Sequence, residues 1–245
     1  MRNDLIFDLG FHNGDDTDFY LAKGFRVVAV EANPAMAEAG AKRFRPAVKN
    51  SRLTLLNKAV SDSSQTITFY VHPGKSHWSS CLKEMAESDG TPAKPVRVSP
   101  VNIAELCASY GVPRYIKVDV EGCDALAAKQ IEALKEKPKF VSFETSKKDY
   151  AGIFSYLYAA GYKRYQLVNQ ANNPGRGAPE KTLEGKAIKY KFGEHSTGYF
   201  GLDLPAGKWL TYQEALSRYL KYRELKAVDN QELGLGWLDV HARLD

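Results

Sequence analysis

Cysteine is scarce in this sequence, which holds only three among its 245 residues. Cys81, Cys107 and Cys123 lie far apart and form neither a CxxC motif nor a cysteine–histidine spacing typical of zinc sites. Cys107 falls within an apolar pattern of helical period, so it is interpreted as a core residue. This usage favours a reduced, cytoplasmic setting over a disulfide framework.

Long apolar runs are also missing, and no stretch approaches the roughly 20 residues that cross a membrane. The first predicted strand begins within five residues of the first methionine, which leaves no space for a signal peptide. The net charge is only +5, and basic residues are interleaved with acidic ones. A basic groove for nucleic acid is therefore disfavoured, and we expect no membrane span. Nothing in the sequence predicts an oligomeric state.

The most informative stretch covers residues 5–34 and predicts a strand, a glycine turn, a helix and a second strand. Gly10 and Gly14 bracket the turn, where missing side chains would let a ligand approach the backbone. Asp8 precedes the turn, and Glu31 ends the second strand, where a carboxylate can accept both hydroxyls of a ribose. The sequence therefore predicts half of a nucleoside-binding α/β domain.

Two cofactor classes use such a layout. Dinucleotide enzymes require G-x-G-x-x-G, and the run from Gly10 lacks the second and third glycines. Enzymes that use S-adenosylmethionine favour an acid two residues before the first glycine, as Asp8 is here. The remaining alternative is an αβ unit that binds nothing, but an aspartate within an apolar strand is costly without a partner.

The rest of the chain continues the alternation of strands and helices. Further strands are predicted at residues 53–60, 65–72, 96–101, 114–120, 140–145, 162–169 and 198–204. Further helices are predicted at residues 34–44, 103–110, 123–135, 150–160 and 211–226, and the tail beyond them is unassigned. We predict one α/β domain over residues 1–245: a doubly wound, mostly parallel sheet with helices on both faces. The strand at 65–72 is expected to be antiparallel.

Four acids fall at or near predicted strand ends, namely Asp8, Glu31, Asp119 and Glu144. Because ligands bind at the carboxyl ends of parallel strands, we expect these side chains to converge on an active site. Two long irregular segments, residues 73–95 and 170–197, are expected to shape the pocket of the second substrate.

These pieces resemble the FkbM family of S-adenosylmethionine-dependent methyltransferases. The resemblance rests on Asp8-Leu-Gly10-x-x-x-Gly14-x-x-Thr17, Val30-Glu31-Ala-Asn33-Pro34, Lys58-Ala59-Val60-Ser61-Asp62, and Ile116-Lys117-Val118-Asp119-Val120-Glu121-Gly122. It implies a class I methyltransferase fold, Rossmann-like and seven-stranded with an antiparallel last strand. His12, in place of a small or amide residue, and Asp124, in place of glutamate, depart from the family pattern.

The resemblance also implies methyl transfer from S-adenosylmethionine, most often to a hydroxyl of a sugar, glycan or other small molecule. Cofactor-binding residues implied in this way are Asp8, Gly10, Asn13, Gly14, Thr17, Glu31, Ala32, Ala59, Val60 and Asp119. In this carry-over Asp8 and the glycine turn face the methionine part, Glu31 holds the ribose, and Ala59 and Val60 lie near the adenine.

Methyl transfer to a hydroxyl also requires a base or a metal that removes the proton. Candidate catalytic residues are Asp119, Glu121, Glu144 and His195, and a carboxylate pair could instead hold Mg²⁺. His195 is alone in its segment, and a surface position is an equally simple interpretation. Two alternatives stay open: a methyltransferase acting on RNA or protein, and a cofactor-binding domain without catalytic activity.

Overall fold

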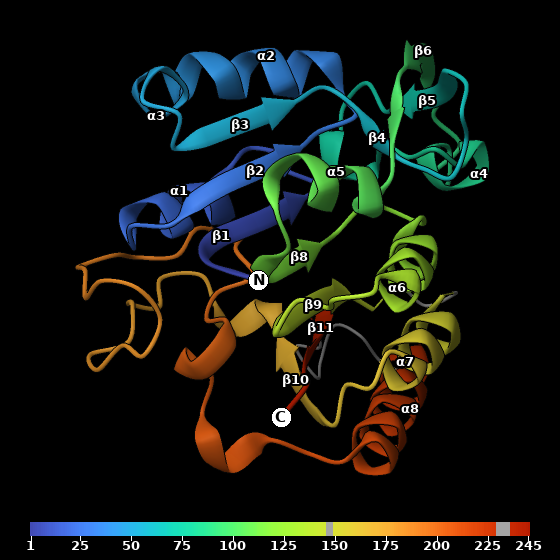
Figure 1. Cartoon of the computed structure of the whole chain (residues 1–245). Helices are drawn as coiled ribbons and strands as arrows, with labels where there is room; N and C mark the ends of the chain where they lie inside the picture. Colours follow the sequence, from blue (N-terminus) through green and yellow to red (C-terminus); the bar gives the residue numbers. More distant parts are fainter. Residues whose placement is uncertain (146–148, 229–235) are drawn as a thin grey trace.

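The computed structural model describes residues 1–145, 149–228 and 236–245, and its centre is a seven-stranded sheet (Figure 1). The order across this sheet is β10-β11-β9-β8-β1-β2-β3. The strands are β1 (Arg2–Leu9), β2 (Arg26–Val30), β3 (Leu53–Leu56), β8 (Pro113–Val118), β9 (Phe140–Glu144), β10 (Arg164–Asn169) and β11 (Leu238–Arg243). β11 runs antiparallel to both neighbours, and the other pairs are parallel. The predicted fold class is confirmed.

One face of the sheet is covered by a continuous row of helices. Leu5, Phe7 and Leu9 alternate along β1 and enter one buried cluster. That cluster is completed by α5 (Ile103–Tyr110), α6 (Asp124–Ala133), α7 (Tyr150–Ala159) and α8 (Tyr212–Val228), which lie side by side in Figure 1. These helices hold the carboxyl ends of β8 and β9 in fixed positions.

The opposite face has a different cover. Ile6 points to it, and α1 (Asp15–Ala22) packs there together with an irregular segment that supplies Phe192 and Phe200. Phe200 is fully buried and stacks on Tyr115 of β8 with ring centres 4.9 Å apart. Beside the edge strand β3 lie α2 (Pro34–Arg43) and α3 (Arg45–Lys49). Chain without regular structure therefore replaces much of the helical layer that the sequence predicted on this face.

The single strand predicted at residues 53–60 is wrong, because the chain changes sheets within it. β3 ends at Leu56, and β4 (Ala59–Val60) pairs instead with β7 (Pro100–Val101). Between them the Asn57 side chain donates to the Glu31 carbonyl at 2.9 Å, which directs the chain across the end of β2. The antiparallel strand predicted at residues 65–72 is confirmed as β5 (Ile67–Val71), which pairs with β6 (Lys94–Val98).

The strand predicted at residues 198–204 is also wrong. This stretch holds a short 3-10 helix, η3 (Gly201–Asp203), and its aromatic residues pack on the face of the sheet. The antiparallel strand is β11, in the tail left unassigned. Its alternate residues Asp239 and His241 are polar yet nearly fully buried, which concealed the strand from an apolar pattern.

The two long segments contain little regular structure. Residues 73–95 include η1 (Ser76–Trp78) and α4 (Lys83–Ala86), and β6 begins within them. Residues 170–197 begin with η2 (Gln170–Asn172) and then run without helix or strand, and η4 (Ala206–Lys208) follows later. Within the described ranges, no helix combines the length and the apolar character needed to cross a bilayer.

Candidate active site

A cavity of about 710 Å³ opens at the carboxyl ends of β1, β2, β8 and β9. Its volume falls within the range usual for small-molecule sites. Both long segments contribute to its wall. Of the residues predicted from the sequence, those that line it are Gly10, Asn13, Glu31, Ala32, Ala59, Val60, Asp119, Glu121, Glu144 and His195. Asp8, Gly14 and Thr17 lie outside this lining.

The glycines of the turn are required by contacts within the protein. At Gly10 the backbone has φ +90°, and an added Cβ would lie 1.7 Å from the carbonyl oxygen of Asp119. At Gly14 an added Cβ would lie 2.5 Å from the ring of Phe11 and 2.6 Å from that of Phe44. Both glycines are therefore required by close packing of the turn against the end of β8 and two aromatic rings, and Gly10, which lines the cavity, also leaves space there for a ligand.

Asp8 and Thr17 lie beneath the turn and are completely buried. The Thr17 hydroxyl donates to Asp8 at 2.6 Å. Burial raises the pKa of Asp8, and the nearby Lys117 ammonium opposes that change. Neither residue is among those that line the cavity, so the cofactor-binding role predicted for both, with Asp8 facing the methionine part, stays a prediction. They support the turn from below.

Lys117 is a buried cation at the centre of this support. Its Nζ donates to the Gly10 carbonyl at 2.8 Å and lies 3.5 Å from carboxylate oxygens of Asp8 and Asp119, with Asp16 at 3.8 Å. Burial lowers the pKa of Lys117, but the surrounding carboxylates outweigh it and raise that pKa well above its usual value. Lys117 therefore stays charged and joins the glycine turn to the end of β8.

Glu31 occupies the end of β2 with its orientation fixed. One carboxylate oxygen accepts from the His12 backbone N–H at 2.7 Å, and the other accepts from the Asn33 N–H at 2.7 Å. Burial raises the pKa of Glu31 to about 7, against the lowering effect of these two N–H groups. Each oxygen has further acceptor capacity, so the group can still receive hydroxyls from a ligand.

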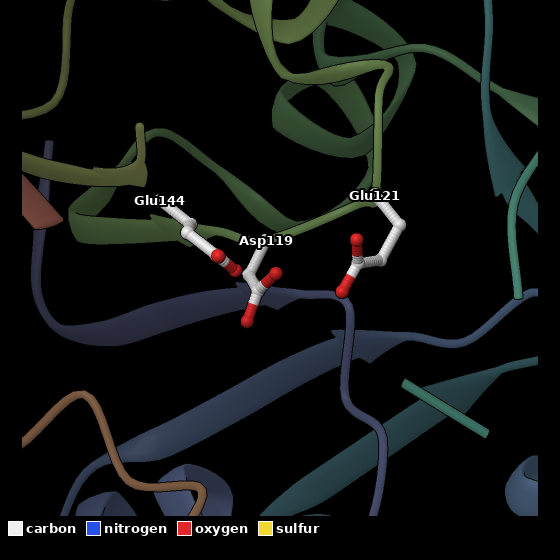
Figure 2. A group of neighbouring side chains, drawn as sticks. All are labelled: Asp119, Glu121 and Glu144. Carbon is white, nitrogen blue, oxygen red and sulfur yellow. The ribbon is translucent and has the colours of Figure 1, made fainter. Parts of the chain in front are cut away.

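Three carboxylates converge on the far side of the cavity. Figure 2 shows Asp119, Glu121 and Glu144 extending into the same space, and one oxygen from each lies within 4.8 Å of the others. Burial raises the pKa of Glu144 well above its usual range, and Asp119 and Glu121 raise it further. Burial and Asp119 also raise the pKa of Glu121. The group can hold a proton between carboxylates or bind a divalent cation through oxygen ligands.

The chain matches the family model of the "Methyltransferase FkbM domain" over residues 8–164. This match covers well over half of the 245 residues, including the glycine turn, Glu31 and all three carboxylates.

The chain belongs to the FkbM methyltransferase family.

Solved structures similar to this FkbM chain are also methyltransferases. The Methylobacillus flagellatus methyltransferase FkbM is 18% identical, with 68% of this chain and 41% of that chain covered and a TM-score of 0.44. The Bacillus cereus O-methyltransferase in complex with SAH is 14% identical, with 67% of this chain and 66% of that chain covered and a TM-score of 0.37. The Geobacter metallireducens precorrin-6y C5,15-methyltransferase is 12% identical, with 77% of this chain and 75% of that chain covered and a TM-score of 0.39. The chain thus spans less than half of the Methylobacillus chain. No curated protein matches the sequence.

In this FkbM chain the turn that carries Glu121 has an unusual backbone. Glu121 adopts φ +49°, a left-handed conformation that costs free energy in a residue with a side chain. The turn is held by Ser80, whose hydroxyl donates to the Glu121 carbonyl at 2.6 Å. Asp124 accepts from the N–H groups of Val120 at 3.0 Å and Gly122 at 3.1 Å. The aspartate that departs from the family pattern therefore fixes the turn.

Three histidines from three separate segments meet at the mouth of the cavity. The ring centre of His195 lies 5.0 Å from that of His12 and 5.9 Å from that of His77. His12 Nε2 is 2.9 Å from the Ser76 hydroxyl. Burial, together with His195, lowers the pKa of His12 to about 4, so its imidazole is neutral near pH 7. His195 thus has neighbours that its isolated place in the sequence did not suggest.

Several site residues were absent from the sequence prediction. Lys117 was quoted only as part of the family motif, although a lysine inside an apolar strand is itself a signal of a buried partner. Asp16 lines the cavity and accepts from the Thr197 N–H at 2.9 Å, which ties the second long segment to α1. No spacing in the sequence connects His77 with His12, because only the tertiary fold brings them together.

Proposed function

We propose that this FkbM-family chain binds S-adenosylmethionine in the cavity and transfers its methyl group to a hydroxyl of a sugar, glycan or other small molecule. The observation that carries the proposal is the position of Glu31, Asp119 and Glu144. These acids line one cavity at the carboxyl ends of neighbouring parallel strands, within the region that matches the methyltransferase family. Ligands of open α/β sheets bind at this edge.

The lining supports a distinct position for each part of the cofactor. Glu31 is prepared to accept the two ribose hydroxyls, since its own oxygens are already oriented by backbone N–H groups. Ala32, Ala59 and Val60 supply an apolar wall beside it, suited to the adenine ring. The turn from Gly10 to Asn13 then receives the methionine part, whose cationic sulfur is favoured near the carboxylates.

The sulfonium supplies an electrophilic methyl group, and the protein's task is to position the acceptor and remove one proton. As the oxygen–carbon bond forms, the sulfur–carbon bond breaks and the sulfur keeps the electron pair. The hydroxyl proton passes to the carboxylate of Asp119, which Lys117 holds in place at 3.5 Å. Glu144 lies beside Asp119 in the same cavity and orients the acceptor.

Three variants of this chemistry are separated by simple tests. If Asp119, Glu121 and Glu144 act through a bound Mg²⁺, EDTA should abolish turnover and added magnesium should restore it. If Asp119 is the base itself, EDTA should have no effect. If His195 is the base, a His195→Ala variant should lose turnover while Asp119→Asn retains it.

The decisive experiment has a binding stage and a transfer stage. Calorimetric titration with S-adenosylhomocysteine, with NAD as the control, should give binding only for the former. Labelled S-adenosylmethionine is then supplied with a panel of glycans, small alcohols, tRNA and peptides, and label is expected in the glycan or small-alcohol arm. Label in tRNA or peptide would show that the acceptor is a nucleic acid or a protein instead. Binding with no transfer to any acceptor would indicate a non-catalytic domain. Tight NAD binding would overturn the proposal.

A further inference from the structure

Two of the three cysteines meet in the cavity wall, although they are far apart in the sequence. Cys81 follows η1 in the first long segment, and Cys123 follows the turn that carries Glu121. Both residues line the same cavity, and the Cys123 thiol lowers the pKa of Cys81. Both are free thiols of intermediate exposure, so small reagents that enter the cavity can reach them.

The backbones on either side of this pair are already held together. The Ser80 hydroxyl donates to the Glu121 carbonyl at 2.6 Å. Ser80 directly precedes Cys81, and Glu121 lies two residues before Cys123. Ser80 is also paired with Tyr70 of β5 through two backbone hydrogen bonds of 2.8 and 3.0 Å. At Gly122 an added Cβ would lie 2.3 Å from the Met85 sulfur. Residues 80–86 therefore pack directly on the turn that leads into Cys123, which brings the two cysteine-bearing segments together.

We propose that Cys81 and Cys123 form a reversible disulfide that locks residues 80–86 onto the turn bearing Glu121. The oxidant is a low-molecular-weight disulfide such as oxidised glutathione. The Cys81 thiolate attacks one of its sulfurs and releases one small thiol, which leaves a mixed disulfide on Cys81. The Cys123 thiolate then attacks the Cys81 sulfur and displaces the second small thiol.

This exchange is balanced. Two protein thiols are oxidised to one disulfide, one small disulfide is reduced to two thiols, and the two protons released by the cysteines end on those thiols. The Cys123 thiol lowers the pKa of Cys81, which supports Cys81 as the attacking group. Such cysteines, partly exposed and beside a second thiol, are typical of reversible redox sites in reducing compartments.

Cys107 is the matched control that the chain itself provides. It lies on α5 against the main core, and burial raises its pKa to about 11, so it should react slowly. A lock that joins residues 80–86 to the turn would restrict the wall that carries His77 and Trp78. Its effect on cofactor exchange rests on the proposed function, whereas disulfide formation itself does not.

The test oxidises the folded chain of residues 1–245 with oxidised glutathione, alkylates the remaining thiols and counts them by mass spectrometry. Reactive thiols should fall from three to one, with one cross-linked peptide pair that contains Cys81 and Cys123 and disappears on treatment with dithiothreitol. Cys107→Ser should lose two thiols in the same way. Cys81→Ser and Cys123→Ser should give no internal cross-link. Three surviving thiols in the wild type, or a cross-link to Cys107, would overturn the proposal.

A second measurement tests the lock without any ligand. Limited proteolysis should cleave residues 73–86 more slowly in the oxidised chain than in the reduced chain. The Cys123→Ser variant, treated identically, should show no such difference. Equal cleavage rates in the two forms of the wild type would overturn the locking role. If the disulfide forms but S-adenosylhomocysteine binds neither form, the proposed function fails while the disulfide stands.

Discussion

Glu31 is the single side chain on which cofactor affinity should depend most. Both of its oxygens are oriented by backbone N–H groups, so the carboxylate meets a ligand without losing side-chain freedom. Replacing Glu31 with alanine should make the binding free energy of S-adenosylhomocysteine less favourable by roughly 1.5–3 kcal/mol, the value of a hydrogen bond to a charged group. Calorimetric titration measures this, with Glu38→Ala as the control, since Glu38 pairs with Lys42 on the exposed side of α2. If wild type and Glu31→Ala bind S-adenosylhomocysteine with equal affinity, Glu31 does not hold the ribose.

Asp119 is the residue on which turnover should depend most. Asp119→Asn keeps the shape of the side chain but removes the base, so kcat should fall by about 10²–10⁴-fold. The affinity for S-adenosylhomocysteine and the unfolding midpoint should stay close to wild type, and the exposed substitution Asp4→Asn should change neither kcat nor binding. Steady-state kinetics beside titration measures the separation. Full turnover in Asp119→Asn would show that another residue acts as the base, and His195 is the next candidate.

His241 makes stability depend on pH. It is buried in β11, and neither ring nitrogen has a hydrogen-bond partner within the described ranges. Burial lowers the pKa of His241 from 6.5 to about 3, so the unfolded chain takes up this proton first as the pH falls. The contribution is present above pH 6.5 and is lost progressively below it, by about 2 kcal/mol at pH 5.

Urea unfolding at pH 7 and pH 5 measures this loss, with His241→Phe as the comparison. Glu31 and Asp124 have raised pKa values and act in the opposite direction, since protonation favours their folded state at low pH. The wild type should therefore lose more stability between the two pH values than His241→Phe, whatever the sign of the total. Identical differences in both proteins would contradict a buried neutral imidazole.

Among the strands of the seven-stranded sheet, those with a clear apolar run were predictable and β11 was not. The parallel strands around Asp8, Glu31, Asp119 and Glu144 could be predicted because apolar runs mark them and acids mark their ends. β11 could not, since Asp239 and His241 interrupt its apolar pattern while lying inside the protein. Its antiparallel character was implied by the family resemblance but was assigned to the wrong residues.

The site shows the same division. The acids at strand ends were predictable, because a parallel sheet places all carboxyl ends at one edge. The histidine group and the Cys81–Cys123 pair were not, since their members come from segments whose approach no spacing encodes. Asp8 precedes the glycine turn as the motif requires, but its complete burial beside Lys117 could not be predicted from the sequence.

As an element, β11 should be essential for a complete sheet. It fills the space between β9 and β10 with two ladders of hydrogen bonds, and its removal would leave both neighbours with unpaired edges. A chain truncated after residue 228 should therefore aggregate or lose its cooperative unfolding transition. Removal of Asp245 alone, whose exposed carboxylate pairs with Lys139, should cost less than about 1 kcal/mol. Solubility and urea unfolding measure the outcome. A soluble, cooperatively folded truncation would show that β9 and β10 close without it.

For the whole molecule, ligand binding should appear as added stability. A ligand that binds only the folded state contributes about 2.7 kcal/mol when its concentration is one hundred times Kd. In a chain of this size, each kcal/mol raises Tm by about 2–4 °C, so S-adenosylhomocysteine should raise it by roughly 5–11 °C. Differential scanning fluorimetry measures the shift, with NAD as the negative control and Glu31→Ala expected to show a smaller shift at the same concentration. No shift at saturating ligand would contradict binding at the cavity.

The position of β11 between β9 and β10 has a consequence for the order in which the chain is synthesised. Translation delivers β1, β2, β8 and β9 first, so the strands that carry Glu31 and Asp119 can pair while the ribosome is still at work. β9 and β10 have no direct contact in the finished ladder and must wait for residues 238–243 to emerge. The nascent chain therefore exposes two unsatisfied strand edges until the end of this segment is released, which makes that interval the time when it most needs a chaperone.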